Sequence, residues 1–310
     1  MTPLSFDFSM WFKNLQLYRL PADWRITPAQ LEEQLAKIPF QPCGTLTMQS
    51  AGWVPPKNDE DALVYTLDRH WLLALCTEQK LLPASVVNQV THDRIEEMEQ
   101  QQGYRPGRKQ AQQIKEQVTE ELMPRAFSRR RTTQVWLDTL NGWLAVNAGS
   151  ANQADDVVQY LHKAVENFSL RPLVTQTSPA AAMTDWLSSG DAPAGFTIER
   201  ECELCAPDEE KATVRYARHP LDADEIPAHI AAGKRATRLA LTWDDRIAFV
   251  LTDKMQVKRV QFLDVLQEEA ESQADNGDSF YSDFALMTAE FSRFLPQLVE
   301  ALGGEAKEGV

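Results

Sequence analysis

The sequence predicts an α+β fold in which antiparallel hairpins and meanders are flanked by helices. Residues 132–149 contain two β-rich runs joined by Asn141-Gly142, a dipeptide that favours a type I′ hairpin turn. Residues 234–262 contain three β-rich runs separated by short polar turns, which predicts a meander. Residues 284–302 place apolar side chains at helical spacing. Strands joined by short turns favour an antiparallel sheet over an alternating parallel βαβ array.

Capping boxes, prolines and glycines mark the ends of the other expected elements. In chain order these are a helix that Thr27, Pro28 and Gln30 begin, a strand over 45–56, a hairpin over 70–83, a helix over 84–103 that ends at Gly103, a helix from Ser150 and Gln153 to about residue 168, and a helix that Asp222 and Glu225 begin and Gly233 ends.

The order of these elements divides the chain into lobes. Residues 68–90 and 244–266 share a strand, turn, strand, helix plan, which is compatible with two related lobes. Residues 100–117 are polar, rich in glutamine and poor in core residues, so they are expected to project from the body. The expected parts are a tail (1–9), an N-terminal α+β lobe (10–98), a helical arm or tip with a basic loop (99–131), a middle α+β region (132–220) and a C-terminal α+β lobe with an acidic helical end (221–310).

Composition favours a globular protein without membrane contact. Of the 310 residues, 43% are hydrophobic and 25% are charged, which is enough for a buried core and excludes a disordered chain. No apolar run approaches the roughly 18 residues that span a bilayer. The first residues lack the basic and apolar regions of a signal peptide. The protein is therefore expected in the cytoplasm.

No motif predicts catalysis, a metal site or a cofactor. The Gly-rich phosphate loop, G-x-S-x-G and H-E-x-x-H are absent. Cys202 and Cys205 stand as Cys-x-x-Cys, but zinc needs two more ligands, and the nine-residue gap between His219 and His229 is too wide for a finger. Residues 206–211 hold Pro-Asp and Glu-x-Lys pieces of metal-dependent nucleases, yet these pieces are contiguous, so a solvated loop is expected. The sequence therefore offers no recognisable catalytic site.

Positive charge is concentrated in two parts of an acidic chain. The net charge is −14, yet Arg125, Arg129, Arg130 and Arg131 fall within seven residues. Further basic residues lie on the predicted meander, whereas residues 260–292 contain acidic residues and neither Lys nor Arg. Such segregation permits binding to a polyanion, because a binding surface responds to the local field and not to the total charge.

Two interpretations of the arginine run remain open. In the first interpretation, its guanidinium groups contact nucleic-acid phosphates, with which arginine forms bidentate hydrogen bonds. Alternatively, they pair with the acidic surface of another subunit or with carboxylates of the same chain. Phe127, which stands between Arg125 and Arg129, is either a core anchor or an exposed contact at a partner surface.

Short segments distributed over residues 10–307 carry a family resemblance. They are MWFKNLQLYRL, PFQPCG, GWVPP, KLLP, LMPRAFSR, WLDTLNG, AGK and LVEALGGEAK. In this order they resemble the RdgC family of recombination-associated proteins from proteobacteria. None of these segments is a catalytic motif, but the ordered set is specific. Residues 1–9 have no counterpart in the family pattern.

The resemblance implies a DNA-binding protein without enzymatic activity or cofactor. Members of the family form a ring-shaped homodimer whose central hole admits double-stranded DNA. They bind duplex with little sequence preference, associate with the nucleoid, restrain the recombinase RecA and support replication. The implied partners are therefore double-stranded DNA and a second copy of the chain, with RecA as a functional antagonist.

The matched segments also imply roles for particular residues. The PRAF segment implies that Arg125 contacts phosphate and that Phe127 closes the ring by apolar contact between two tips. The AGK segment implies Lys234 as a lining residue, and KLLP implies Lys80. Arg218 keeps a positive charge that the family often carries there. The local charge pattern adds four candidate DNA contacts: Arg129, Arg130, Arg131 and Arg235.

A second function class fits the same residues. The chain is then a protein-interaction module that binds a recombination or replication factor through the arginine-rich loop. In this case charge reversal in the loop removes a protein partner and leaves DNA affinity unchanged. A third class, a metal-dependent nuclease, lacks a recognisable site in the sequence.

Overall fold

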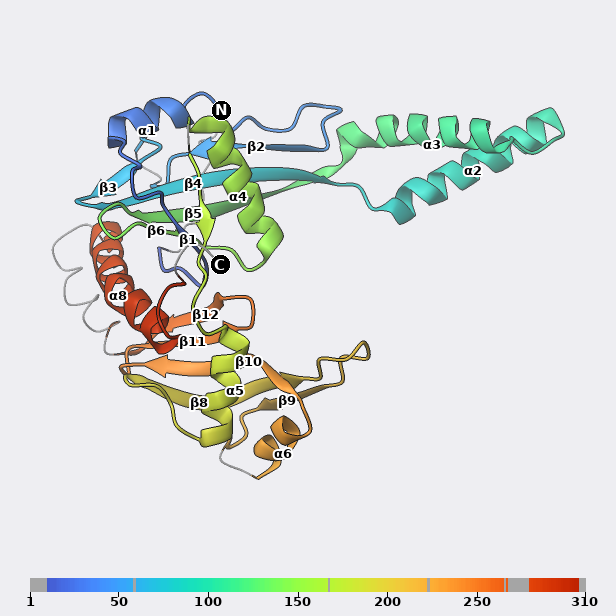
Figure 1. Ribbon diagram of the computed structural model, residues 1–310. Coiled ribbons are helices and arrows are strands. Elements are labelled where there is room, and N and C mark those ends of the chain that lie inside the picture. Colours follow the sequence, from blue (N-terminus) through green and yellow to red (C-terminus); the bar gives the residue numbers. More distant parts are fainter. Residues whose placement is uncertain are drawn as a thin grey trace.

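The computed structural model describes residues 10–57, 60–166, 168–221, 224–264, 266 and 279–306. Over these residues the fold is α+β, with one large antiparallel sheet and seven α-helices, which confirms the predicted fold class. Figure 1 shows helices on both sides of the sheet and a helical arm that projects from one end of its upper part.

The sheet contains twelve strands in the order β2-β4-β5-β6-β1-β12-β11-β10-β8-β9, with β3 paired to β4 and β7 paired to β1. The first strand joins the two halves of the sheet, because β1 pairs with β6 on one side and with β12 on the other. The strands are β1 (Asn14–Arg19), β2 (Gln49–Val54), β3 (Tyr65–Leu67), β4 (His70–Leu81), β5 (Phe127–Asp138), β6 (Trp143–Val146), β7 (Arg171–Pro172), β8 (Phe196–Cys205), β9 (Thr213–Ala217), β10 (Arg235–Trp243), β11 (Ile247–Thr252) and β12 (Gln256–Phe262).

The helices cover both faces of this sheet and form the arm. They are α1 (Pro28–Leu35), α2 (Ala84–Gln102), α3 (Arg108–Leu122), α4 (Ala151–Ala164), α5 (Pro179–Ser189), α6 (Glu225–Ala231) and α8 (Ser279–Ala301), with a short 3₁₀ helix, η1 (Met123–Arg125), after α3.

Side-chain alternation divides the hydrophobic core between the two faces of the sheet. Leu72 and Trp136 are cross-strand partners on β4 and β5, and they pack in the cluster that contains α5 and α8. Leu73 and Val135 form the neighbouring pair and pack in the cluster that contains α1 and α4. We call these the α8 face and the α4 face. Because successive strand residues point to opposite faces, even-numbered residues of β4 and β5 take the α8 face and odd-numbered residues take the α4 face.

The arm is the helical connection between β4 and β5. Helices α2 and α3 pack against each other around a small core of their own that contains Val87, Ile114 and Val118. Arg94 of α2 and Glu121 of α3 form a two-bond ion pair across them, with both N···O distances at 2.9 Å. The arm therefore begins and ends at the same edge of the body, where β4 ends and β5 begins (Figure 1).

The predicted hairpin over residues 70–83 is wrong. β4 is one strand of 12 residues. Its polar stretch Thr77–Gln79 pairs with Gln49–Ala51 of β2 and with Arg129–Arg131 of β5. Pairing on both sides satisfies the backbone of this stretch, so its polar side chains do not end the strand. The strand-turn-strand plan expected for both lobes therefore holds for β11 and β12 but not for β4.

The hairpin of β5 and β6 is confirmed, but its turn is longer than the two residues expected. Pairing ends at Asp138, and the loop contains Thr139–Gly142. Within it, Gly142 has a φ of +69°. The buried Asp138 carboxylate accepts hydrogen bonds from the backbone N–H groups of Leu140, at 3.1 Å, and Asn141, at 3.0 Å. A buried carboxylate thus orders this loop, and the sequence pattern did not indicate this role.

Most other predicted element ends agree with the structure. The meander is confirmed as β10, β11 and β12. Three helix boundaries are also confirmed: the capping box of Thr27 and Gln30, the N-cap of Ser150 and the left-handed end of α2 at Gly103. Asp222 lies outside the described residues, and α6 begins at Glu225.

Candidate nucleic-acid interface

The arginine run is part of strand β5 and not of a loop. Arg129 and Arg131 have odd numbers and take the α4 face, whereas Arg130 takes the α8 face. Arg129 and Arg131 are both exposed, and neither forms an ion pair with any residue that the structure describes. The strand therefore separates three consecutive arginines into two without a carboxylate partner and one that is paired with the buried Glu78.

Arg130 pairs with a buried carboxylate on the α8 face, and its own side chain is 34% exposed. Its Nε lies 3.1 Å from Oε1 of Glu78, its cross-strand partner, and its guanidinium lies 5.5 Å from the centre of the Phe40 ring. Glu78 is 3% exposed. Its second oxygen accepts a 2.6 Å hydrogen bond from the backbone N–H of Cys43, and Ser128 donates to the first at 2.8 Å. Arg130, predicted as a DNA contact, thus has a structural role.

Burial and hydrogen bonding act in opposite directions on Glu78. Burial raises the pKa of its carboxyl, but the hydrogen bonds from Cys43, Ser128 and Arg130 outweigh this effect and hold the pKa below its ordinary value. The carboxylate is therefore charged at neutral pH. Its negative charge is matched by Arg130, which keeps the guanidinium on the α8 face.

Lys80 is also buried, which removes it from the candidate DNA contacts. Its side chain is on the α8 face and the residue is 7% exposed. Its ammonium donates to the carbonyl of Thr45, at 2.6 Å, and to that of Met123 in η1, at 3.1 Å. One charge therefore links the segment before β2 to the base of the arm. A group with this burial and these partners has no room for a phosphate.

Arg125 and Phe127 lie at the base of the arm. Arg125 ends η1 and is exposed. Phe127 begins β5 with 84% of its surface exposed, so the core-anchor interpretation is wrong. Its cross-strand partner, Leu81, is 50% exposed and shares the α4 face with it. The tip of the arm is formed instead by the turn around Tyr104, between α2 and α3.

The basic candidates of the C-terminal half lie at two separate places. Lys234 donates to the carbonyl of Ala212 at 3.2 Å, and Arg235 follows it at the start of β10. Both are therefore near the turn between β8 and β9. Arg218 follows the other end of β9 and is exposed, with a φ of +56°. The five residues of β9 separate the two places by about 15 Å.

Carboxylates of β8 pair with guanidinium groups of β9, β10 and β12. Glu201 accepts hydrogen bonds from Arg259, at 2.7 Å, and from Arg215, at 2.9 Å. The hydrogen bond from Arg259 is the main favourable contribution, and it holds the pKa of Glu201 below its ordinary value in spite of burial. Arg238 lies 3.8 Å from Glu203. The period-two pattern Glu199, Glu201, Glu203 was the sequence signal for this acidic row, and its significance was missed.

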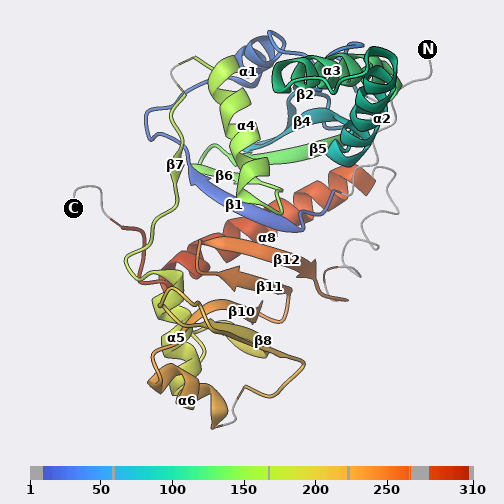
Figure 2. The same ribbon diagram turned by 90° about the vertical axis from the view of Figure 1, so that its right-hand side faces the viewer.

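The exposed cations of both halves face the same side of the molecule. Figure 2 looks onto this side, with the arm and α4 above and the strands β1, β12, β11, β10 and β8 below. In Figure 1, the arm and the turn between β8 and β9 project in the same direction. Lys258 of β12 donates to the carbonyl of Gly149, just before α4, at 3.2 Å, which places it on the α4 face. The α4 face thus carries Arg129 and Arg131 on the N-terminal half of the sheet and Lys258 on the C-terminal half.

The structure also tests the metal and cysteine motifs of the sequence over the residues that it describes. It contains no group of three or more His, Cys, Asp or Glu side chains that could hold a metal ion. Residues 206–211 form an exposed turn in which Lys211 N–H donates to Asp208. Burial raises the pKa of Cys76 and of Cys202 to about 11, so both thiols are protonated at neutral pH. None of the helices described here is long and apolar enough to cross a membrane.

Comparison with known proteins assigns the chain to a family. The family described as "Putative exonuclease, RdgC" matches residues 10–305. The chain is 60% identical over 303 residues to the recombination-associated protein RdgC of Dechloromonas aromatica (strain RCB), which covers 96% of the chain and 99% of that protein. It is 54% identical over 297 residues to the protein of the same name from Herminiimonas arsenicoxydans. This match covers 96% of the chain and 99% of that protein.

The chain therefore belongs to the RdgC family, as its segments indicated. The relatives are named as recombination-associated proteins, whereas the family description mentions a putative exonuclease. Association with DNA recombination follows from the family, and the mode of action is a separate question.

Replacement of Lys80 tests the buried link to the arm. Lys80→Met keeps the aliphatic stem but leaves the carbonyls of Thr45 and Met123 without their donor. We expect the free energy of unfolding, measured by urea denaturation, to fall by about 1–3 kcal/mol. Lys115→Met, on the exposed surface of α3, is the control and should be neutral. Equal stability of the two variants would show that the ammonium is not part of the fold.

Replacement of Glu78 tests the ionic cluster through its pH dependence. The pKa of Glu78 is depressed in the folded protein, so its contribution is full above the ordinary value of 4.5 and is lost as the pH falls through the folded value. Glu78→Gln should therefore be less stable than the wild type at pH 7, and the difference should shrink below about pH 4.5. Glu120→Gln, at an exposed site, is the control. A difference that does not vary with pH would contradict the assignment.

Proposed function

We propose that the chain binds double-stranded DNA without sequence preference as a ring-shaped homodimer, restrains RecA-dependent recombination and supports replication. Membership of a family whose relatives are named recombination-associated proteins supports this proposal. It acts by occupying duplex and not by cleaving it, needs no cofactor, and is located in the cytoplasm on the nucleoid.

One observation carries the DNA-binding part of the proposal. Arg129 and Arg131 are exposed on the α4 face without a carboxylate partner among the described residues, in a chain whose net charge is −14. Exposed guanidinium groups without a carboxylate partner are available to an external anion. Duplex DNA supplies phosphates at about one charge per 1.7 Å, and phosphate contacts carry no sequence information.

The direction of two projections supports the ring. The arm and the turn between β8 and β9 project from the two ends of the chain's sheet in the same direction (Figure 1). A second copy related by a two-fold axis would meet both projections and enclose a hole lined by the same residues twice. Two isologous contacts are needed for closure. Phe127 and Leu81 form an exposed apolar pair that suits one of these two contacts. Under the proposal, this contact is a gate that opens to admit DNA.

A protein-interaction module remains the second candidate. The exposed Phe127 and Leu81 pair lies on the same strands as Arg129, and an aromatic side chain beside arginine is typical of protein interfaces. In this case the partner is a recombination or replication factor. The third candidate function is the nuclease that the family description mentions. Magnesium-dependent loss of duplex DNA on a gel would support it.

Variants of consecutive arginines test the DNA contact with an internal control. Affinity for a labelled duplex of about 30 base pairs is measured by fluorescence anisotropy at several salt concentrations, with unrelated sequences as competitors. The double variant Arg129→Ala/Arg131→Ala should reduce the slope of log affinity against log salt by about 1.8, because each phosphate contact contributes about 0.9.

Arg130→Ala is the matched control, because this side chain points to the other face and pairs with Glu78. It should lower stability and leave the slope unchanged. Equal slopes for the double variant and the wild type would favour the protein-interaction module. Unequal competition by unrelated sequences would contradict binding without sequence preference.

Replacement of Phe127 tests closure of the ring. Phe127→Ser removes the aromatic side chain from the proposed contact, which should weaken dimerisation, measured by sedimentation, by at least about tenfold. The variant should also dissociate faster from closed circular DNA. Val174→Ser, which changes another exposed apolar residue, is the control. If both dimerisation and dissociation from closed circular DNA were unchanged, the proposed gate at Phe127 would be contradicted.

A further inference from the structure

Charged side chains of the C-terminal strands share the side of the sheet that faces away from α5 and α8. On β8, Cys202 is buried in the cluster that contains these helices, so its neighbours Glu201 and Glu203 take the opposite side. Its cross-strand partner on β9, Tyr216, packs against the same cluster, so Arg215 also takes the opposite side. This is the side on which α4 lies, and Figure 2 looks onto it.

Strand β12 turns two consecutive cations to the same side. Val257 and Val260 are both buried in the cluster of α5 and α8, although regular alternation would place residues three positions apart on opposite sides. Arg259 has a φ of +52°, and the pairing of β11 with β12 shifts register beside it. Because of this irregularity, Lys258 reaches the carbonyl before α4 while Arg259 reaches across the sheet to Glu201.

Glu201 lies between two arginines that come from different strands. Its Oε1 atom lies 2.9 Å from Nη2 of Arg215 and 2.7 Å from Nη2 of Arg259. The side chain of Glu201 is 23% exposed, whereas the side chains of Arg215 and Arg259 are 52% and 53% exposed. An anion that approaches from solvent therefore meets the two guanidinium groups first, and the carboxylate lies beneath them.

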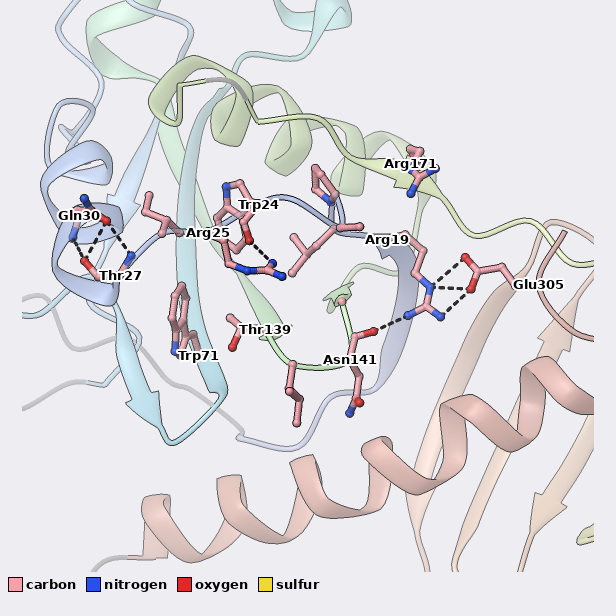
Figure 3. Close-up of a pocket in the computed structure, with 16 residues that line it drawn as sticks. Arg19, Trp24, Arg25, Thr27, Gln30, Trp71, Thr139, Asn141, Arg171 and Glu305 are labelled. Atoms are coloured by element: carbon pink, nitrogen blue, oxygen red, sulfur yellow. Dashed lines mark hydrogen bonds and ion pairs between the residues drawn. The ribbon is translucent and has the colours of Figure 1, made fainter. Parts of the chain in front are cut away.

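The ion pair of Arg19 and Glu305 differs from this group in its balance of charge. Figure 3 shows the pair at a pocket of about 750 Å³ whose lining includes the loop Thr139–Gly142. Nε and Nη2 of Arg19 lie 2.7–3.0 Å from the carboxylate oxygens, and the guanidinium lies 3.4 Å from the centre of the Trp143 ring. Here one carboxylate matches one arginine, whereas Glu201 leaves its two arginines with one formal positive charge in excess.

The excess charge makes the group around Glu201 attractive to phosphate. A guanidinium carries several N–H donors in a fixed plane, so each arginine keeps donors that Glu201 does not occupy. The carboxylate is charged at neutral pH, because the hydrogen bond from Arg259 holds the pKa of Glu201 below its ordinary value. It therefore repels a phosphate that binds the same arginines and competes for their hydrogen bonds.

We propose that Glu201 is an internal competitor of duplex phosphate, and that Arg215 and Arg259 are the cations for which the two compete. The inference rests on the proposed function and adds to it two DNA contacts and a residue that limits affinity. Duplex bound to these arginines is held less tightly than their charge alone would allow, so the chain releases DNA more readily. Removal of the carboxylate should then strengthen binding, whereas removal of a DNA contact weakens it.

The test is fluorescence anisotropy of a labelled duplex of about 30 base pairs with the full chain, at several salt concentrations. Glu201→Gln keeps the shape of the side chain and raises the charge of the group by one. The slope of log affinity against log salt should become steeper by at least about 0.9, the contribution of one phosphate contact. At about 0.15 M salt this corresponds to a gain in affinity of about fivefold.

Glu305→Gln is the matched control, because it removes one carboxylate from an arginine and changes the net charge of the chain equally. The backbone N–H of Arg259 donates to the side chain of Asn14 at one end of β1, and Arg19 lies at the other end. The five positions between them span about 17 Å, which exceeds the Debye length of about 8 Å in 0.15 M salt. Glu305→Gln should therefore bind duplex as the wild type does.

A second carboxylate of β8 keeps the test open if Glu201→Gln fails to fold, which thermal melting would reveal. Glu203 lies 3.8 Å from Arg238 and accepts a 2.8 Å hydrogen bond from Thr237. Because this ion pair is longer, Glu203→Gln should raise affinity for the duplex in the same direction but by a smaller factor.

Three outcomes would overturn the inference and leave the proposed function standing. The first is a slope for folded Glu201→Gln equal to that of the wild type, while Arg129→Ala/Arg131→Ala lowers the slope. The second is an equal gain in Glu305→Gln, which indicates an effect of total charge. The third is weaker binding by folded Glu201→Gln, which shows that the carboxylate orients its arginines toward phosphate. If the wild type does not bind duplex at low salt, the proposed function fails as well.

Discussion

The antiparallel ladder between β4 and β5 determines where the features of the N-terminal half lie. It runs without a register shift from the pair His70–Asp138 to the pair Leu81–Phe127. One end of the ladder carries the pocket loop, and the other end carries the arm. A slip of one residue would exchange the faces of every side chain along it. Arg129 and Arg131 would then enter the buried cluster, and Arg130 and Glu78 would lose their shared site.

The buried charges at the arm end of this ladder oppose such a slip. An isolated buried charge is costly, but here Glu78 has three donors and the Lys80 ammonium has two carbonyl acceptors. Those partners come from β5, from η1 and from the segment before β2. Their geometry is satisfied in one register, so the cluster specifies the pairing and the start of the arm together.

Local patterns in the sequence were sufficient for much of the fold. The capping box at Thr27, the left-handed end of α2 at Gly103 and the meander of β10, β11 and β12 depend on residues close in the chain, and each was predicted. The continuity of β4 was not predicted, because it depends on two partner strands whose positions a local pattern does not contain. The same limitation placed the arginine run in a loop.

The candidate site required the fold before its residues could be separated. Sequence reasoning grouped Arg129, Arg130 and Arg131 as equal candidates, and alternation along β5 gives Arg130 a buried partner. Lys80 was nominated by a family segment, yet it is buried. Whether a basic residue is free depends on carboxylates distant in the chain. Arg259 and Glu201 are 58 positions apart, yet Nη2 of Arg259 lies 2.7 Å from Oε1 of Glu201.

The acidic row on β8 also bears on how an acidic chain can bind DNA reversibly. The ion pairs of Arg215, Arg238 and Arg259 are half-exposed, and such pairs contribute about 0–1 kcal/mol each. A phosphate can therefore displace a carboxylate at small cost, but the gain is reduced by the interaction that is lost. Guanidinium groups without a carboxylate partner, such as that of Arg129, keep their full attraction for a phosphate. Under the proposed function, Arg129 and Arg131 then hold duplex firmly and the paired guanidinium groups of β9, β10 and β12 hold it weakly, which suits a ring that encloses DNA without fixing its register.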